Sequence, residues 1–147
     1  MSAIADLLDV NVWLALAVES HPPHKTALES WLHTLRRPTF CRVTQLGFLR
    51  LLCNRQVMGT LTFEPSDAWV EYEELLSQDI VHFIEEPPEI EVNLRGFTKG
   101  AKAARDFWTD AYLAALAQAA GMRIVTFDAG FGRFKDLDCL ILATQTQ

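Results

Sequence analysis

The chain has 147 residues, of which 50% are apolar and 22% charged, and its formal net charge is -6. This size and balance indicate one compact domain. The negative net charge argues at first against a nucleic-acid binder, because the usual surface of such proteins is basic. No window resembles a membrane-spanning segment or a secretory signal, so we expect a cytoplasmic protein that does not contact a membrane. The three cysteines lie far apart in apolar sequence, which favours buried reduced thiols over disulfides or a zinc site.

The first third of the chain predicts two strands and three helices. Residues 3–8 are expected to form a strand that ends at Asp9, and Asn11 is a candidate cap for the apolar helix after it. From His24, apolar residues recur at helical spacing as far as Leu35. Residues 39–43 suit a second strand, with Thr44 as the cap of a helix that ends near Cys53.

The remainder continues the alternation of strands and helices. Residues 54–63 are expected to be a loop, and Pro65 suits the first position of a helix. Residues 80–84, 123–127 and 139–143 are the further predicted strands. Residues 100–120 are rich in helix-forming side chains, with a break expected near Phe107 and an end at Gly121.

Strands that alternate with helices predict a mostly parallel sheet covered on both faces, because parallel neighbours need crossover helices that pack on the sheet. We therefore expect an α/β fold: a three-layer sandwich with a short, mostly parallel sheet flanked by helices, in which residues 1–147 form a single domain.

Three aspartates are expected to meet at one edge of this sheet. A helix of about ten residues after Asp110 advances about 15 Å, and the five-residue strand that follows returns about 17 Å, which brings Asp128 back beside Asp110. Asp9 also follows its strand directly, and the carboxyl ends of parallel strands share the edge where ligands of such sheets bind. The alternative for each aspartate is a helix cap or a turn.

Crowded carboxylates repel one another unless a proton or a cation neutralises them. Ligands made only of oxygen select Mg²⁺ or Mn²⁺, and such an ion can polarise a phosphoryl oxygen and lower the pKa of a bound water. We therefore predict phosphodiester hydrolysis, with Asp9, Asp110 and Asp128 as metal ligands. Asn11 and Thr126 are expected to support the acids.

Charge is distributed unevenly along the chain. Residues 64–91 contain ten Asp and Glu residues and no Lys or Arg, which leaves 13 basic and 9 acidic residues elsewhere. An acid-free run of four cations lies just before Asp110: Arg95, Lys99, Lys102 and Arg105. Such a run is usually a solvated helix face, and a phosphate-binding surface is the alternative.

Four segments together resemble the PIN-domain ribonucleases of the VapC toxin type. They are "LLDVNVWLAL" (7–16), "VTQLGFLRLL" (43–52), "TDAYLAALA" (109–117) and "TFDAGF" (126–131), in matching order and spacing over almost the whole chain. The resemblance implies a PIN-like nuclease domain over residues 1–147.

This resemblance also implies an activity and partners. It implies a Mg²⁺- or Mn²⁺-dependent endoribonuclease toxin that cuts RNA, with a transfer or ribosomal RNA loop as the expected substrate. Members are usually homodimeric and are neutralised by a cognate VapB-type antitoxin. On the matching segments, the catalytic acids would be Asp9, Asp110 and Asp128, with Asn11, Thr44 and Thr126 as supporting polar residues. The expected contacts to RNA or antitoxin are Arg50, Lys99, Lys102 and Arg105.

One position departs from the family pattern. Many relatives carry Glu three residues after the threonine of the middle helix, where this chain has Gly47. Gln45 is neutral and lies about 200° around the helix from that position, so it is a poor replacement. Asp106 lies one turn before Asp110 and is a further candidate ligand for the vacancy, with a plain surface charge as the alternative.

Two other functions fit parts of the sequence. Because of Gly47, a non-catalytic PIN-fold module that binds RNA or protein is the main alternative. The "DVNV" segment at residues 9–12 also resembles the loop of haloacid-dehalogenase phosphatases, but Asn11 stands where that loop needs a proton-exchanging aspartate.

Overall fold

The computed structural model describes residues 5–143. Its five short strands form one parallel sheet in the order β3-β2-β1-β4-β5. The strands are β1 (Asp6–Leu8), β2 (Pro38–Phe40), β3 (His82–Phe83), β4 (Arg123–Thr126) and β5 (Cys139–Ile141). The two neighbours of β1 belong to opposite halves of the chain, so the carboxyl end of β1 lies where the strand order changes direction, a usual place for a ligand.

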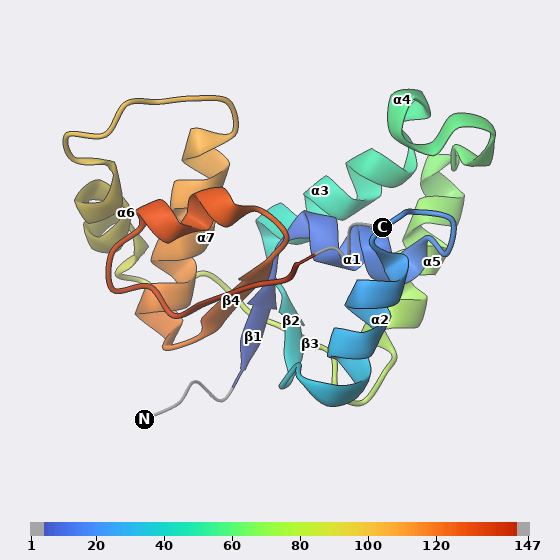
Figure 1. The fold of residues 1–147 in the computed structure, drawn as a ribbon, viewed down its shortest axis with the longest axis horizontal. Coiled ribbons are helices and arrows are strands. Elements are labelled where there is room, and N and C mark those ends of the chain that lie inside the picture. The colour runs from blue at the N-terminus through green and yellow to red at the C-terminus, as the bar shows by residue number, and fades with distance from the viewer. Residues whose placement is uncertain (1–4, 144–147) are drawn as a thin grey trace.

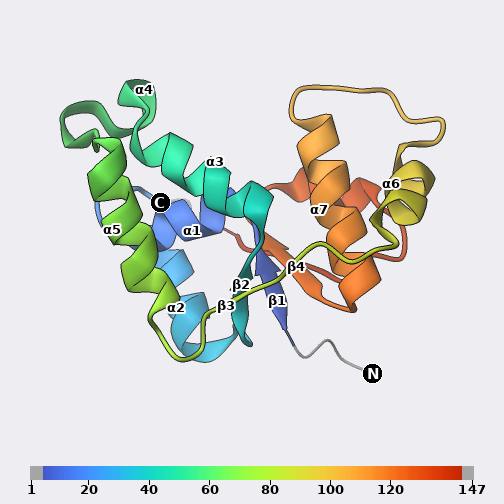
Figure 2. The same cartoon turned by 180° about the vertical axis from the view of Figure 1, so that it is seen from behind.

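Helices cover both faces of the sheet (Figures 1 and 2). One face carries α6 (Ile90–Thr98) and α7 (Phe107–Ala120). The other carries α1 (Val10–Ala17), α2 (His24–His33), α3 (Arg42–Leu52) and α5 (Pro65–Leu76). The short α4 (Arg55–Met58) and the 3-10 turn η1 (Gly59–Leu61) follow α3, and a second 3-10 turn, η2 (Ala129–Arg133), follows β4. The predicted three-layer α/β sandwich is confirmed.

Each face of the sheet has its own apolar core. Leu7 and Ile124 pack in the cluster beneath α6 and α7, whereas the next residues, Leu8 and Val125, pack in the cluster beneath α1, α3 and α5. This alternation follows from the two-residue period of a strand. It explains why both central strands are apolar at consecutive positions, as strands buried on both faces must be.

Several local predictions were wrong. Asp9, not Asn11, is the N-cap of α1, and Cys41, not Thr44, is the N-cap of α3. Residues 54–63 are not a plain loop, because they contain α4 and η1. Helix α6 was not predicted, and the helix expected from residue 100 begins only at Phe107. Pro65 and Gly121 open and end their helices as predicted.

The three cysteines are all free thiols. Cys41 is buried, whereas Cys53 and Cys139 are half-buried. Across residues 5–143, no helix combines the length and the apolar character needed to cross a membrane.

Candidate active site

Asp9 lies at the junction of β1 and α1, at the carboxyl edge of the sheet. Its backbone N–H donates to the carbonyl of Val125 at 2.9 Å, which fixes it beside β4. One carboxylate oxygen accepts from the Val10 N–H at 2.8 Å, and the other accepts from the Thr126 hydroxyl at 2.8 Å. Asp9 is only 9% exposed. Its carboxylate is therefore held in one orientation by the ends of two adjacent strands.

Thr126 and Asn11 tie those strand ends together. The fully buried Thr126 hydroxyl oxygen accepts from the Asp128 N–H at 3.0 Å and from the Asn11 side-chain amide at 3.3 Å. The side-chain oxygen of Asn11, Oδ1, in turn accepts from the Phe127 N–H at 3.3 Å. The structure thus brings both predicted supporting residues into contact with the segments that carry Asp9 and Asp128.

The other two acids reach the same edge from α7 and η2. Asp110 is buried in the first turn of α7, where the positive end of the helix dipole favours a carboxylate. Asp128 is exposed and caps η2, and its carboxylate accepts from the Gly130 N–H at 2.8 Å. Asp110 Oδ2 accepts from Arg133 Nη2 at 3.1 Å. Arg133 was not predicted from the sequence, because no local pattern links it to a carboxylate 23 residues earlier.

The acids are close enough to disfavour one another's ionised forms. The pKa of Asp110 is raised to about 6: burial is the largest cause, the negative charges of Asp9 and Asp128 add to the rise, and Arg133 opposes it. Burial also raises the pKa of Asp9, against the Thr126 and Val10 hydrogen bonds, with Asp128 and Asp106 adding repulsion. A cation at this edge would relieve that repulsion.

The donor chemistry of this edge fits a hard divalent cation. Carboxylates and a hydroxyl are the available ligands, and no thiol or imidazole belongs to the set. Within residues 5–143, however, no three His, Cys, Asp or Glu side chains are already gathered as a metal cluster. Asp110 Oδ2 is engaged by Arg133 and Asp128 Oδ1 by the Gly130 N–H, so one oxygen of each carboxylate already has a partner with which an ion would compete.

Thr44 and Asp106 are placed less favourably than predicted. Thr44 is fully buried, and its hydrogen bonds all go to Cys41, so it secures the start of α3 rather than an acid. Asp106 is not on a continuous helix with Asp110, because it has a left-handed backbone (φ 61°) and is the N-cap of α7. Its exposed side chain lies 3.9 Å from Arg105, but its charge still acts on Asp9.

The predicted cationic contacts fall in two places. Lys99, Lys102 and Arg105 are exposed in the segment between α6 and α7, which leads to Asp110. Arg50 is exposed in the last turn of α3, about two turns from the sheet edge where that helix begins. Lys99, Lys102 and Arg105 are therefore close to Asp110 along the chain, whereas Arg50 is not.

Gly47 lies where α3 crosses the start of α1. A Cβ atom at this position would lie 2.6 Å from Val10 Cγ2, and Val10 follows Asp9 directly. The close approach of the two helices thus leaves no room for a glutamate without displacing Val10. Gln45, the other residue considered for the vacancy, is buried and accepts from Arg42 at 2.6 Å, so it is engaged elsewhere.

We expect Gly47→Ala to lower the free energy of unfolding by about 1 to 2 kcal/mol, because overpacking outweighs the helix propensity gained. The matched control is Gly96→Ala in α6, where a Cβ meets nothing within 4 Å and alanine should stabilise by about 0.5 to 1 kcal/mol. Urea unfolding of the two variants and the parent measures both effects. Equal and stabilising effects at the two positions would show that Gly47 is not needed for the helix crossing.

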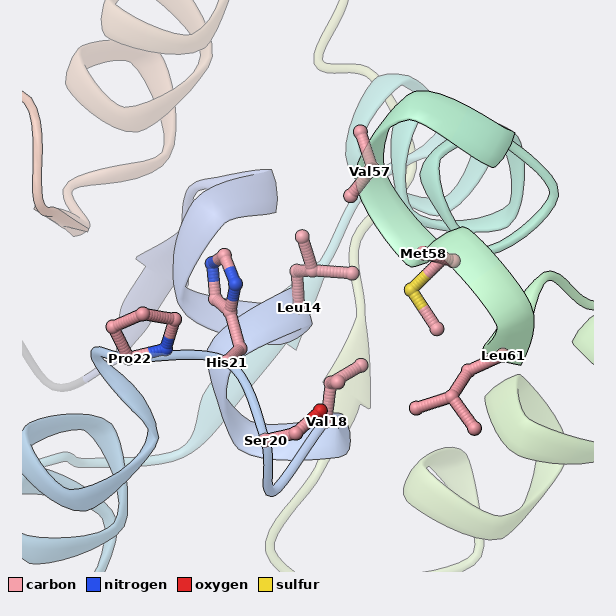
Figure 3. A pocket seen from close by; sticks show the side chains of 8 residues that line it. All are labelled: Leu14, Val18, Ser20, His21, Pro22, Val57, Met58 and Leu61. Carbon is pink, nitrogen blue, oxygen red and sulfur yellow. The ribbon is translucent and has the colours of Figure 1, made fainter.

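A separate hollow of about 150 Å³ lies beyond the last turn of α1. Figure 3 shows Leu14 and Val18 on one side of it and Val57, Met58 and Leu61 on the other. His21 also lines the hollow, and burial lowers its pKa. None of the candidate acids lines it, so this hollow is not part of the acidic edge.

Comparison with known proteins finds relatives that match most of the chain. The sequence matches the PIN domain family over residues 7–137. Ribonuclease VapC41 of Mycobacterium tuberculosis is 40% identical over 144 residues, covering 93% of this chain and 98% of that protein. Ribonuclease VapC25 of the same organism is 32% identical over 133 residues, covering 87% of this chain and 92% of that protein.

Solved structures share the fold at lower identity. VapBC2 from Rickettsia felis, bound to a promoter DNA fragment, superposes with a TM-score of 0.67 at 12% identity, covering 95% of this chain and 99% of that chain. VapC20 of Mycobacterium tuberculosis, a sarcin-ricin loop cleaving toxin, has a TM-score of 0.67 at 17% identity, covering 87% and 93%. With its aspartates on the carboxyl edge of a parallel sheet and these relatives over nearly its full length, the chain belongs to the PIN-domain family and to its VapC type.

Proposed function

We propose that this protein is a Mg²⁺- or Mn²⁺-dependent endoribonuclease toxin that cleaves an RNA phosphodiester bond. The observation that carries the proposal is the position of Asp9, Asp110 and Asp128 at one sheet edge, where the charges of Asp9 and Asp128 act on Asp110 and the charge of Asp128 acts on Asp9. The two Mycobacterium tuberculosis relatives are named ribonucleases, which supports the same activity here.

Asp9, Asp110 and Asp128 would hold the ion, with Asp106 as a further candidate ligand whose charge already reaches Asp9. When bound, a divalent ion supplies a more acidic water and offsets negative charge on the phosphate. The chain itself orients Asp9 through Thr126 and Val10 and holds the Asp128 backbone through Thr126. No side-chain nucleophile is needed, because water attacks the phosphorus.

The substrate we propose is a loop of transfer or ribosomal RNA. The related fold of VapC20 belongs to a toxin that cleaves the sarcin-ricin loop, which is consistent with a structured RNA. Lys99, Lys102 and Arg105 are exposed next to the start of α7 and would pair with phosphates flanking the cleaved bond. Arg50, farther along α3, would contact RNA or antitoxin outside the cleavage point.

The partner we propose is a VapB-type antitoxin. The VapBC2 structure from Rickettsia felis and the VapBC-1 structure from nontypeable Haemophilus influenzae, which has a TM-score of 0.66, contain VapB with VapC. We also propose a homodimer, a cytoplasmic location and a single nuclease domain over residues 1–147. The family match over residues 7–137 and the sheet shared by both apolar cores support the single domain.

A non-catalytic binding module is the second candidate. Gly47 replaces the usual glutamate, and Arg133 already neutralises Asp110, so the fold could retain RNA without cutting it. Membership of the PIN family removes the support for the haloacid-dehalogenase alternative.

Removal of divalent ions tests the proposed activity. Purified protein incubated with structured RNAs should make discrete cuts in Mg²⁺ or Mn²⁺, lose them in excess EDTA, and regain them when Mg²⁺ is restored. Mapping the RNA ends by primer extension gives the cut positions. If the protein binds these RNAs but makes no metal-dependent cut, the nuclease proposal is wrong and the non-catalytic binding module is supported.

A further inference from the structure

Arg133 reaches from the end of η2 to the acid on α7. Its Nη2 donates to Asp110 Oδ2 at 3.1 Å, and its Nη1 donates to the Gly130 carbonyl at 2.7 Å. Two nitrogens of one guanidinium are therefore engaged, one by the turn that carries Asp128 and one by α7.

The guanidinium is held in place on its other sides as well. It lies over the Phe134 ring at 4.6 Å and near the Phe107 ring at 5.9 Å, within the range of cation–π attraction. A Cβ at Gly130 would lie 2.6 Å from Nη1, so the absence of a side chain there makes room for the arginine. The planar guanidinium is thus positioned by the fold rather than drawn in from solvent.

Arg133 occupies the position of a counter-ion. Across residues 5–143, no other Lys, Arg or His pairs with Asp9, Asp110 or Asp128. The Arg133 side chain is 41% exposed, whereas the Asp110 side chain is 12% exposed, so the pair opens to solvent on the arginine side. Outward movement of the guanidinium into solvent would therefore free Asp110 for another partner.

We propose that Arg133 is the resident counter-cation of the acidic edge and competes with a divalent ion for the Asp110 carboxylate. The inference rests on the proposed metal site, and it adds a competitor from within the chain. The pair then lowers the metal affinity of the site, because Arg133 balances the charge of Asp110 in the metal-free protein and metal binding has to overcome that contact. A purely structural bridge predicts the opposite, because its loss would disorder the ligand and weaken metal binding.

The test is calorimetric titration of Mn²⁺ into metal-free Arg133→Gln, with thermal unfolding in EDTA as a second readout. We expect Arg133→Gln to bind Mn²⁺ about fivefold more tightly than the parent, the size expected for losing a partly exposed ion pair. The same variant should unfold at a lower temperature in EDTA, and added Mn²⁺ should recover more stability than it does in the parent.

Two further variants separate competition from general charge. Arg133→Lys keeps the charge but cannot hold Asp110 and Gly130 together as a guanidinium does, so its Mn²⁺ affinity should lie between the parent and Arg133→Gln. Lys135→Gln removes an exposed positive charge two residues away and should bind Mn²⁺ as the parent does.

Unchanged or weaker Mn²⁺ binding by a folded Arg133→Gln protein would overturn the inference and leave Arg133 as a structural bridge. An equal gain in Mn²⁺ affinity in Lys135→Gln would also overturn the inference, because the loss of any nearby positive charge would then explain the tighter binding. Failure of the parent itself to bind Mn²⁺ would remove the proposed metal site, and this inference with it.

Discussion

Asp9→Asn and Asp128→Asn are each expected to reduce metal-dependent RNA cleavage by about 100-fold or more. Each change removes one negative charge and one ligand oxygen from the proposed ion while keeping the side-chain shape. In Asp9→Asn, the remaining side-chain oxygen can still accept from the Thr126 hydroxyl, which keeps the strand ends joined, whereas the bond from the Val10 N–H is lost. Initial cleavage rates at saturating Mg²⁺ measure the effect, and circular dichroism checks that the variants are folded.

The matched control is Asp79→Asn, an exposed aspartate in the turn before β3. Its cleavage rate should equal that of the parent, because the charge of Asp79 does not contribute to the raised pKa of Asp9 or of Asp110. If Asp9→Asn kept more than about a tenth of the parent rate, Asp9 would not be a metal ligand. If Asp128→Asn kept more than about a tenth of the parent rate, Asp128 would likewise not be a metal ligand.

Asp6→Ala is expected to lower the free energy of unfolding by about 3 to 5 kcal/mol, the usual cost of breaking a buried ion pair from one side. Asp6 is 1% exposed at the opposite, amino-terminal edge of the sheet. It accepts two hydrogen bonds from Arg123, at 2.8 and 2.9 Å, and one from the Arg36 N–H at 2.7 Å. Removal leaves the guanidinium of Arg123 and a backbone donor without their acceptor.

Urea unfolding of Asp6→Ala gives this loss as a shift of the transition midpoint. The control is Glu91→Gln, which breaks the exposed pair with Arg95 at 3.8 Å and should change stability by less than about 0.5 kcal/mol. Similar values for the two variants would show that the Asp6 contact does not secure the sheet.

The sheet could be predicted because its strands are apolar at consecutive positions, as at Leu7 and Leu8 or Ile124 and Val125. The same parallel topology placed Asp9, Asp110 and Asp128 at one edge before any side-chain geometry was known. Helix α6 was not predicted, although Ile90, Leu94 and Phe97 recur at helical spacing. The short α4 has no periodic signal at all.

Helix caps and long-range contacts were harder to predict from the sequence. Asn11 and Thr44 are good caps by residue type, but a cap is decided by where the backbone leaves the extended region, and that occurs at Asp9 and Cys41. The Arg133 contact with Asp110 joins η2 to α7 and depends on how those elements pack. The space filled by Val10 beside Gly47 likewise depends on the crossing of α1 and α3.

The central claim is that one divalent ion is shared by Asp9, Asp110 and Asp128. The most direct measurement is the anomalous signal of Mn²⁺ in crystals of the protein grown with that ion. We predict a peak within coordination distance of oxygens from all three carboxylates, with Arg133 turned away from Asp110. A metal-loaded crystal with no peak at this edge, and with Asp110 still bonded to Arg133, would contradict it.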